Sequence, residues 1–447
     1  MKLSRVAAWT SGELVGRDLE CLGVSTDTRT LEEGNLFVAL RGDRFDGHAY
    51  LHDAARAGAA GALVEQDTDA FPGYVRVPDT RRALGRLAAG WAAQFPLQAV
   101  AVTGSAGKTT VKEMLALMLG PGVLATRGNL NNEIGVPLTL LRAESVHRHA
   151  VIELGANHPG EIAWTSTLVQ PRVVMVTNVG GAHLEGFGSM QGIAEAKSEI
   201  LRGLRAGGTA IVNLDDDFAG FFIERAREAG AQVVRVSVHE PAEITAEDIV
   251  VDEAGTRFVC RSGEQRWPVS IPLLGEHQVR NALMALAAVQ ALGLAPGPAA
   301  ERLAGLEAVP GRMEPHACDG GVLIDDSYNA SPVSVRAGIE VLARLPGPRL
   351  LALGAMGELG AHGAALHRDA GAWAKAAGID RLVVLGEDAA PAVEAFGEDG
   401  VLASRHEEII EAARAILRAG GSVLVKGSRA MAMDRVVMAL RGAEEEG

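Results

Sequence analysis

Short apolar runs and helix-like stretches alternate along most of this chain. Near the N-terminus the apolar runs lie at 34–40, 60–65 and 73–78, and residues 51–60 have helical spacing. Short apolar runs bounded by polar, glycine-containing turns predict strands. We therefore expect a small α/β domain at the start of the chain.

Further along, the apolar runs become continuous and are separated by helical patterns. They lie at 97–104, 149–155, 171–180 and 208–217. Continuous apolarity, in place of strict alternation, predicts strands that are buried on both faces. The middle of the chain is therefore expected to form a doubly wound, mainly parallel sheet.

The pattern breaks at Pro310 and Gly311, and a new α/β series follows. Its apolar runs lie at 320–327, 349–356, 380–387 and 421–428. This break predicts a further domain boundary. We expect three α/β domains, with the boundaries 1–81, 82–310 and 311–447.

Composition supports several domains and excludes some functions. The chain has 447 residues, 48% of them hydrophobic, which is too long for one ordinary core. With 42 Lys and Arg against 56 Asp and Glu, the formal charge of −14 argues against binding nucleic acid or an anionic membrane surface. Cys21, Cys260 and Cys318 are far apart in sequence, which favours packing roles in a reducing compartment. No apolar stretch reaches the length of a membrane span, about 18 residues. We expect a soluble, cytoplasmic protein without membrane insertion.

The clearest chemical motif is "TGSAGKTT", between a predicted strand and a predicted helix. In this context backbone N–H groups of 104–107 can face phosphate oxygens, and Lys108 can reach the β- and γ-phosphates. Thr109 can place its hydroxyl on Mg²⁺. Val102 stands where the full motif has its first glycine, so the loop is shortened; a glycine turn before a surface helix is the alternative. The candidate residues are Gly104, Ser105, Ala106, Gly107, Lys108, Thr109 and Thr110.

Polar residues also follow the next two strands. Glu153 stands at the end of the apolar run that begins at His149, Asn178 stands at the end of the run that begins at Pro171, and His183 and Glu185 follow in the loop beyond it. In open parallel sheets such strand ends face the ligand crevice. Glu153 is therefore a candidate magnesium ligand. An ordinary acidic strand end and a solvated loop histidine are the alternatives.

Nine segments together resemble one family. They are "TGSAGKTT", "TRGNLNNEIGVPLTLL", "ELGANHPGEI", "TNVGGAHLEGFGS", "AKSEIL", "LLGEHQVRN", "GRMEPH", "IDDSYNASP" and "VLVKGSRAMAMD". In order and content they resemble the motifs of the Mur ligases, ATP-dependent enzymes that add amino acids to the UDP-N-acetylmuramoyl peptide of bacterial cell walls. The segment "STDTRTLEEGNLFVALRGDRFDGHAY" further resembles the branch that adds D-alanyl-D-alanine to the tripeptide. The DNPR segment usual in the branch that adds the third residue is absent.

The resemblance implies a UDP-binding first domain, a central P-loop ATPase domain and a Rossmann-like third domain. It also implies ATP, an acyl-phosphate intermediate and two Mg²⁺ ions, one held by Thr109 and Glu153, the other by His183 and Lys197. In the family the lysine of such a segment is carbamylated by CO₂. By its sequence alone Lys197 would be an exposed lysine among glutamates.

The same resemblance assigns further nucleotide contacts. Asn281 is expected near the adenine, with a helix cap as the alternative. Arg312 follows the Pro-Gly break and can reach a phosphate when the domains close, with ordinary surface charge as the alternative. Asp326 ends a strand, which suits a ribose hydroxyl.

Candidate substrate residues come from all three domains. Asn129, Asn131 and Asn132 suit a peptide backbone, since amides both donate and accept, although turn-forming asparagines are the alternative. Ser331 and Pro332 are expected to begin a helix. The other candidates are Ser25, Thr28, Arg29 and His48 for uracil and diphosphate, Tyr328 and Asn329 for nucleotide or dipeptide, and Lys426 and Ser428 for the dipeptide carboxylate.

Three other functions compete with this interpretation. Another Mur-type amide ligase and a folylpolyglutamate synthase share the same chemistry and differ in substrate. A P-loop switch would bind nucleotide and make no bond, but it predicts a full-length phosphate loop. We expect UDP-N-acetylmuramoyl-tripeptide and D-alanyl-D-alanine as small-molecule partners, and a monomer.

Overall fold

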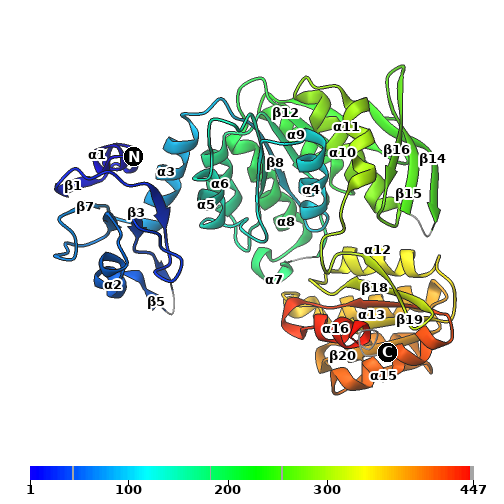
Figure 1. Ribbon diagram of the computed structural model, residues 1–447. Helices are drawn as coiled ribbons and strands as arrows, with labels where there is room; N and C mark the ends of the chain where they lie inside the picture. The colour runs from blue at the N-terminus through cyan, green and yellow to red at the C-terminus, as the bar shows by residue number, and fades with distance from the viewer. Residues whose placement is uncertain (43–44, 182, 253–254, 443–447) are drawn as a thin grey trace.

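The computed structural model describes residues 1–42, 45–181, 183–252 and 255–442. Figure 1 shows three α/β units in chain order, with the blue N-terminal unit at one end and the orange and red C-terminal unit below the central one. Each described unit is built on its own main sheet. The predicted fold class is confirmed.

The N-terminal unit is a small sheet with helices packed on it. Its strand order is β1-β7-β6-β3-β2, and β1 pairs antiparallel with β7. Every residue of β3 and β6 is buried, which explains their unbroken apolar runs. The elements are α1 (Leu3–Thr10), β1 (Glu13–Gly16), β2 (Gly23–Ser25), β3 (Asn35–Val38), β4 (Arg41–Gly42), β5 (Phe45–Asp46), η1 (Gly47–Tyr50), α2 (Leu51–Arg56), β6 (Gly61–Val64) and β7 (Gly73–Arg76).

Helix α3 (Thr80–Ala92) joins this unit to the central one. The Asp79 side chain accepts a hydrogen bond from Arg82 N at 2.9 Å and caps the helix. The predicted boundary between residues 81 and 82 falls in the first turn of α3, and the division itself stays a prediction.

The central sheet has the order β16-β15-β14-β13-β12-β11-β8-β10-β9. From β9 to β14 neighbouring strands are parallel, as expected, and apolar clusters cover both faces. The strands are β8 (Gln98–Thr103), β9 (Val123–Ala125), β10 (His149–Glu153), β11 (Val173–Val176), β12 (Thr209–Asn213), β13 (Gln232–Ser237), β14 (Ile244–Asp252), β15 (Gly255–Ser262) and β16 (Gln265–Ile271). The helices are α4 (Lys108–Leu119), α5 (Gly135–Leu140), α6 (Glu161–Val169), α7 (Leu184–Phe187), α8 (Met190–Ser198), η2 (Glu199–Gly203), α9 (Ala219–Glu228), α10 (Glu276–Ala291), α11 (Pro296–Arg302) and η3 (Leu303–Gly305).

The C-terminal sheet has the order β17-β18-β22-β19-β20-β21, parallel except for β17. Helix α12 begins at Pro332 after Ser331, as the sequence predicts, and Ser331 N donates to Ser334 Oγ at 2.9 Å. The strands are β17 (Glu314–Cys318), β18 (Gly321–Asp326), β19 (Arg349–Gly354), β20 (Arg381–Leu385), β21 (Gly400–Ala403) and β22 (Ser422–Lys426). The helices are α12 (Pro332–Leu342), η4 (Gly360–His362), α13 (Gly363–Ala376), η5 (Glu387–Ala389), α14 (Ala390–Phe396), α15 (His406–Arg418), η6 (Arg429–Met431) and α16 (Asp434–Arg441).

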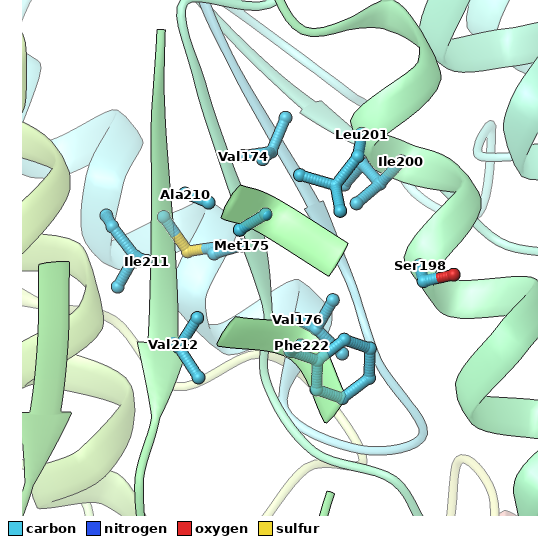
Figure 2. Close-up of a pocket in the computed structure, with 11 residues that line it drawn as sticks. Val174, Met175, Val176, Ser198, Ile200, Leu201, Ala210, Ile211, Val212 and Phe222 are labelled. Atoms are coloured by element: carbon cyan, nitrogen blue, oxygen red, sulfur yellow. The ribbon is translucent and has the colours of Figure 1, made fainter. Parts of the chain in front are cut away.

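Inside the central domain a cavity of about 20 Å³ lies between β11, β12, η2 and α9 (Figure 2). Its lining is apolar apart from Ser198, and Met175, Ile211 and Phe222 contribute from three elements. A space of this size holds about one water molecule, so it is a packing gap and no ligand site. Among the described residues, no helix has the length and apolarity needed to cross a membrane.

Candidate active site

The phosphate loop connects β8 to α4 and requires glycine at two points. Gly104 has φ +148°, and a Cβ there would lie 1.8 Å from Thr177 Oγ1. Gly107 has φ +82°, and a Cβ there would lie 2.8 Å from Asn281 Oδ1. Positive φ and close neighbours both exclude a side chain at these positions. The loop is thus shaped by backbone that only glycine adopts easily.

The loop is tied to the residues that follow β11. Ser105 N donates to Asn178 O at 3.0 Å, and Ala106 N donates to Asn178 Oδ1 at 2.9 Å. In return Asn178 Nδ2 donates to Ala106 O at 3.0 Å. Two of the amides that we expected to face phosphate are therefore engaged by Asn178, because the loop packs directly on the end of the neighbouring strand.

Beyond the loop, two predicted magnesium ligands come together. Thr109 Oγ1, in the first turn of α4, donates to Glu153 Oε2 at 2.9 Å. Glu153 is 2% exposed, and its Oε1 accepts from Asn131 Nδ2 at 2.8 Å. Glu153 ends β10, and Thr109 follows β8; these two strands are adjacent and parallel, so their carboxyl ends share one edge of the sheet. Thr110 lies in the same first turn of α4.

Three nitrogen-bearing side chains act on one another beside this pair, beginning with Lys108, which senses the charge of Glu153. Lys108 Nζ donates to Gly104 O at 2.6 Å, and burial lowers the pKa of Lys108. Lys197, at the end of α8, is 4% exposed; burial, followed by the charge of Lys108, brings the pKa of Lys197 well below its usual value. Burial also lowers the pKa of His183, with smaller contributions from both lysines. Lys197 is therefore buried in the site, and the exposed-lysine alternative is wrong.

The C-terminal domain contacts this cluster. Glu358, in the loop after β19, pairs with His183 Nδ1. The guanidinium of Arg312 lies 4.3 Å from the centre of the Tyr328 ring, and its charge contributes to lowering the pKa of Lys108. Groups from two domains thus converge on the end of the phosphate loop.

Comparison with known proteins matches three family models in successive parts of the chain. Residues 102–289 match the Mur ligase middle domain, residues 311–429 the Mur ligase, glutamate ligase domain, and residues 21–92 the Mur ligase family, catalytic domain. The chain belongs to the Mur ligase family.

Individual relatives of this Mur ligase match over their full length. The UDP-N-acetylmuramoyl-tripeptide–D-alanyl-D-alanine ligase of Escherichia coli is 44% identical, covering 98% of both chains. A crystal structure of MurF from Acinetobacter baumannii superposes with a TM-score of 0.93 at 35% identity, covering 98% of both chains. MurF from Thermotoga maritima, solved in complex with ADP, has a TM-score of 0.86 at 29% identity, with 95% of this chain and 98% of that one covered.

In this Mur ligase, Asn281 lies inside α10 and faces the phosphate loop. The helix begins at Glu276 after Gly275, so the helix-cap alternative for Asn281 is wrong. Asn281 Nδ2 donates to Gln278 Oε1 at 2.9 Å, and Gln278 Nε2 lies 3.0 Å from His277 Nε2. The adenine contact stays a prediction.

The asparagines of the loop before α5 have two different structural roles. Asn132 Oδ1 accepts from Gly135 N at 2.8 Å and shapes the start of α5, as a turn-forming asparagine does. Asn131 contacts Glu153, and Asn129 is exposed. Their contacts to the acceptor peptide stay predictions.

The strand-end residues of the C-terminal domain are bonded to one another. Lys426 Nζ donates to Asp326 Oδ2 at 2.5 Å and to Asn329 O at 2.9 Å, and Lys426 is 2% exposed. Burial raises the pKa of Asp326, although the charge of Lys426 opposes the shift. A dipeptide carboxylate would have to compete with Asp326 for Lys426, whereas Ser428 lies outside this pair. Both roles, and the ribose contact of Asp326, stay predictions.

The first-domain candidates bond mainly within their own loops. His48 Nε2 accepts from Glu65 N at 2.9 Å and its Nδ1 lies 2.6 Å from Asp46 Oδ1, so both ring nitrogens have partners inside the domain. Ser25 Oγ donates to Asp27 O at 2.9 Å. Arg29 pairs with Asp27 at 2.6 Å while 86% of its side chain is exposed, and Thr28 between them is half-buried. Their uracil and diphosphate contacts stay predictions.

Two residues of the site were not predicted from the sequence. Asp216 accepts from Val179 N at 2.8 Å and Phe218 N at 2.9 Å, and its charge opposes the lowering of the Lys197 pKa. It follows β12, so the strand-end rule applied to the first three strands could have found it. Glu358 is brought to the site by domain packing, which no local pattern indicates.

Proposed function

We propose that this Mur ligase joins D-alanyl-D-alanine to UDP-N-acetylmuramoyl-tripeptide, with ATP converted to ADP and phosphate. The observation that carries the proposal is its full-length similarity to relatives of that name. The geometry agrees, because a phosphate loop, a buried carboxylate and a cationic cluster from two domains meet at one sheet edge.

The chemistry has two steps. A carboxylate of the tripeptide attacks the γ-phosphorus of ATP, giving an acyl phosphate and ADP. The free amine of the dipeptide then attacks the acyl carbon, and the tetrahedral intermediate expels phosphate and loses a proton to leave the amide. Lys108 and the N-terminal end of α4 bind the transferred phosphoryl group, so positioning and charge neutralisation dominate the rate.

The donors fit two magnesium ions to different degrees. Thr109 and Glu153 offer buried oxygen atoms 2.9 Å apart, which suits a hard cation. Lys197 as an ammonium does not suit one. As a carbamate it would offer oxygens beside His183, so a second ion needs the modification. When bound, such ions supply charge neutralisation between carboxylate and phosphate.

Carbamylation requires a neutral amine, which adds to CO₂ and releases one proton. The pKa of Lys197 is lowered well below its usual value, because burial and the charge of Lys108 both disfavour the ammonium relative to the neutral amine. This supports Lys197 as the modified residue.

The cellular setting follows from the reaction. We propose that the ligase acts as a monomer in the cytoplasm, without membrane insertion.

The test is phosphate release from ATP by purified protein with Mg²⁺, bicarbonate and UDP-N-acetylmuramoyl-tripeptide, with and without D-alanyl-D-alanine, and mass detection of the pentapeptide. Release that needs both substrates and yields pentapeptide is expected. Phosphate release that requires instead a UDP-N-acetylmuramoyl-dipeptide, whose peptide is one residue shorter, would indicate another amide ligase. Release indifferent to both substrates would indicate a nucleotide switch.

A further inference from the structure

Glu358 lies where the C-terminal domain contacts the reaction centre. Its carboxylate pairs with His183 Nδ1, and its carbonyl oxygen accepts from Glu185 N at 3.1 Å. Glu358 and His183 both have φ +60°, a left-handed conformation that costs free energy in residues other than glycine. Such conformations persist where the surrounding structure fixes them and are common at functional sites.

His367 fixes the loop that carries Glu358. The ring is buried beneath the loop, where its Nε2 accepts from Met356 N at 2.9 Å and its Nδ1 donates to Gly363 O at 2.8 Å. Because Nε2 accepts a hydrogen bond, it carries no proton, and the neutral ring donates from Nδ1. Burial, which lowers the pKa of His367, acts in the same direction. The two bonds hold both ends of the loop, and Glu358 is therefore presented from a fixed support.

The charge around the site makes Glu358 distinctive. Glu153 is 2% exposed and already accepts from two side chains, and Asp326 is paired with Lys426. The Glu358 side chain is 58% exposed. Of these three carboxylates, Glu358 is the one open to an incoming molecule.

A cationic reactant needs such a group. The Lys108 and Arg312 side chains lie close enough for their positive charges to interact. An ammonium group that approaches them is repelled unless a carboxylate offsets the charge. Glu358 faces this cluster through its contact with His183.

The neighbouring loop supplies the opposite charge. Ser428 N donates to Ala355 O at 3.2 Å, and a Cβ on Gly357 would lie 3.5 Å from Ser428 Cβ. Arg429, the next residue, pairs with Asp434 at 3.4 Å, and 68% of its side chain is exposed. One edge of the C-terminal sheet thus presents a carboxylate and, on the adjoining loop, a guanidinium, which complements a small zwitterion.

We propose that Glu358 binds the ammonium group of the incoming dipeptide and positions it beside the reaction centre. The inference rests on the proposed function, because D-alanyl-D-alanine has only methyl side chains and must be recognised through its backbone and termini. In the structure described here, the Glu358 carboxylate is paired with His183. On substrate binding, the ammonium group of the dipeptide replaces His183 as its partner.

The first measurement is steady-state kinetics of Glu358→Gln with each substrate varied in turn. Glutamine keeps the shape and removes the charge, so the KM for D-alanyl-D-alanine should rise about 10- to 100-fold, the range expected for a lost charged hydrogen bond. The KM values for ATP and UDP-N-acetylmuramoyl-tripeptide should stay within about twofold. Glu358→Asp should recover part of the loss. Glu387→Gln, an exposed carboxylate after the neighbouring strand β20, is the matched control and should behave as wild type.

The second measurement separates substrate binding from domain closure. N-acetyl-D-alanyl-D-alanine lacks the ammonium group, so its inhibition constant for wild type should be much higher than the dissociation constant of the free dipeptide. In Glu358→Gln the ratio of these two constants should fall towards one. A residue that only holds the domains together would leave the ratio unchanged.

The outcomes are distinct. If wild type forms no pentapeptide, the proposed function fails and the assignment of Glu358 fails with it. If wild type forms pentapeptide while Glu358→Gln keeps the wild-type KM for the dipeptide, or raises all three KM values together, only the assignment of Glu358 is overturned. A thermal melt of each variant identifies loss of folding, in which case the Glu358→Asp values decide.

Discussion

Thr109 donates a hydrogen bond from its Oγ1 to Glu153 Oε2 at 2.9 Å, across two parallel strand ends. Both groups are buried, at 6% and 2% exposure. A hydroxyl and a carboxylate at this separation are ready to share one hard cation. The contact therefore links the phosphate loop to the proposed magnesium site.

Glu153→Gln should lower pentapeptide formation by about 100-fold, because the amide keeps the volume and removes the charge that holds magnesium. The magnesium concentration giving half-maximal phosphate release should also rise. A magnesium titration of both proteins measures this. Glu144→Gln, at an exposed position, should match wild type. An unchanged magnesium requirement in Glu153→Gln would remove Glu153 from the ligand set.

Gly104→Ala should abolish ATP binding. Its Cβ would meet Thr177 Oγ1 at 1.8 Å, and the positive φ adds strain, so the loop must move away from β11. Gly207→Ala is the matched control, because Gly207 has φ +71° but no atom within 4 Å of the added Cβ. That variant should lose only about 1 kcal/mol of stability. Nucleotide binding by calorimetry distinguishes them, and equal affinities would contradict the role given to the close contact.

Much of the fold could be predicted because its signals are local. The runs at 97–104, 149–155 and 171–180 became β8, β10 and β11, since parallel strands covered on both faces need unbroken apolarity. The glycine-rich phosphate loop was also predicted from a local sequence motif. The antiparallel extension, β14 to β16, was missed. Its first strand has the burial pattern of a sheet with one covered face, so alternation was the available signal.

The site was predictable only where its residues follow strands of one sheet. Glu153 and Thr109 met as expected, because neighbouring parallel strands end at one edge. Lys426 is 100 residues from its partner Asp326, and Glu358 reaches His183 from another domain. The first contact depends on the strand order that places β22 beside β18, and the second depends on domain packing; sequence periodicity encodes neither.

His277 should make stability depend on pH. Burial, followed by Arg280 and Lys426, lowers the pKa of His277 to about 3, below the 6.5 of an unperturbed histidine. The unfolded chain then binds the extra proton first, so this contribution is complete above about pH 6.5 and is lost as the pH falls towards 3. The loss between pH 7.5 and pH 5 should be up to about 2 kcal/mol.

Urea unfolding at pH 7.5 and pH 5, followed by tryptophan fluorescence, measures this effect. His277→Asn should have a smaller drop in the unfolding midpoint between the two pH values than wild type, whatever its stability at pH 7.5. His52→Asn, whose side chain is 67% exposed, should retain the wild-type drop. The same drop in His277→Asn would assign the pH dependence to other groups.

Lys197 should carry a carbamate that the reaction requires. Its side chain is 4% exposed beside His183 and Lys108, where an ammonium is disfavoured and a carbamate would offset the positive charge. Lys197→Ala should therefore lose at least about 100-fold in activity, as expected when an anionic metal ligand is removed. Stripping CO₂ from wild type should lower its activity and bicarbonate should restore it, while Lys375→Ala, at an exposed position in the last turn of α13, should behave as wild type.

Carbon-13 NMR of protein equilibrated with labelled bicarbonate provides a readout independent of activity: a carbamate signal is expected in wild type and in Lys375→Ala but not in Lys197→Ala. A signal that persists in Lys197→Ala would place the modification elsewhere, and full activity of wild type without CO₂ would show that the unmodified amine suffices.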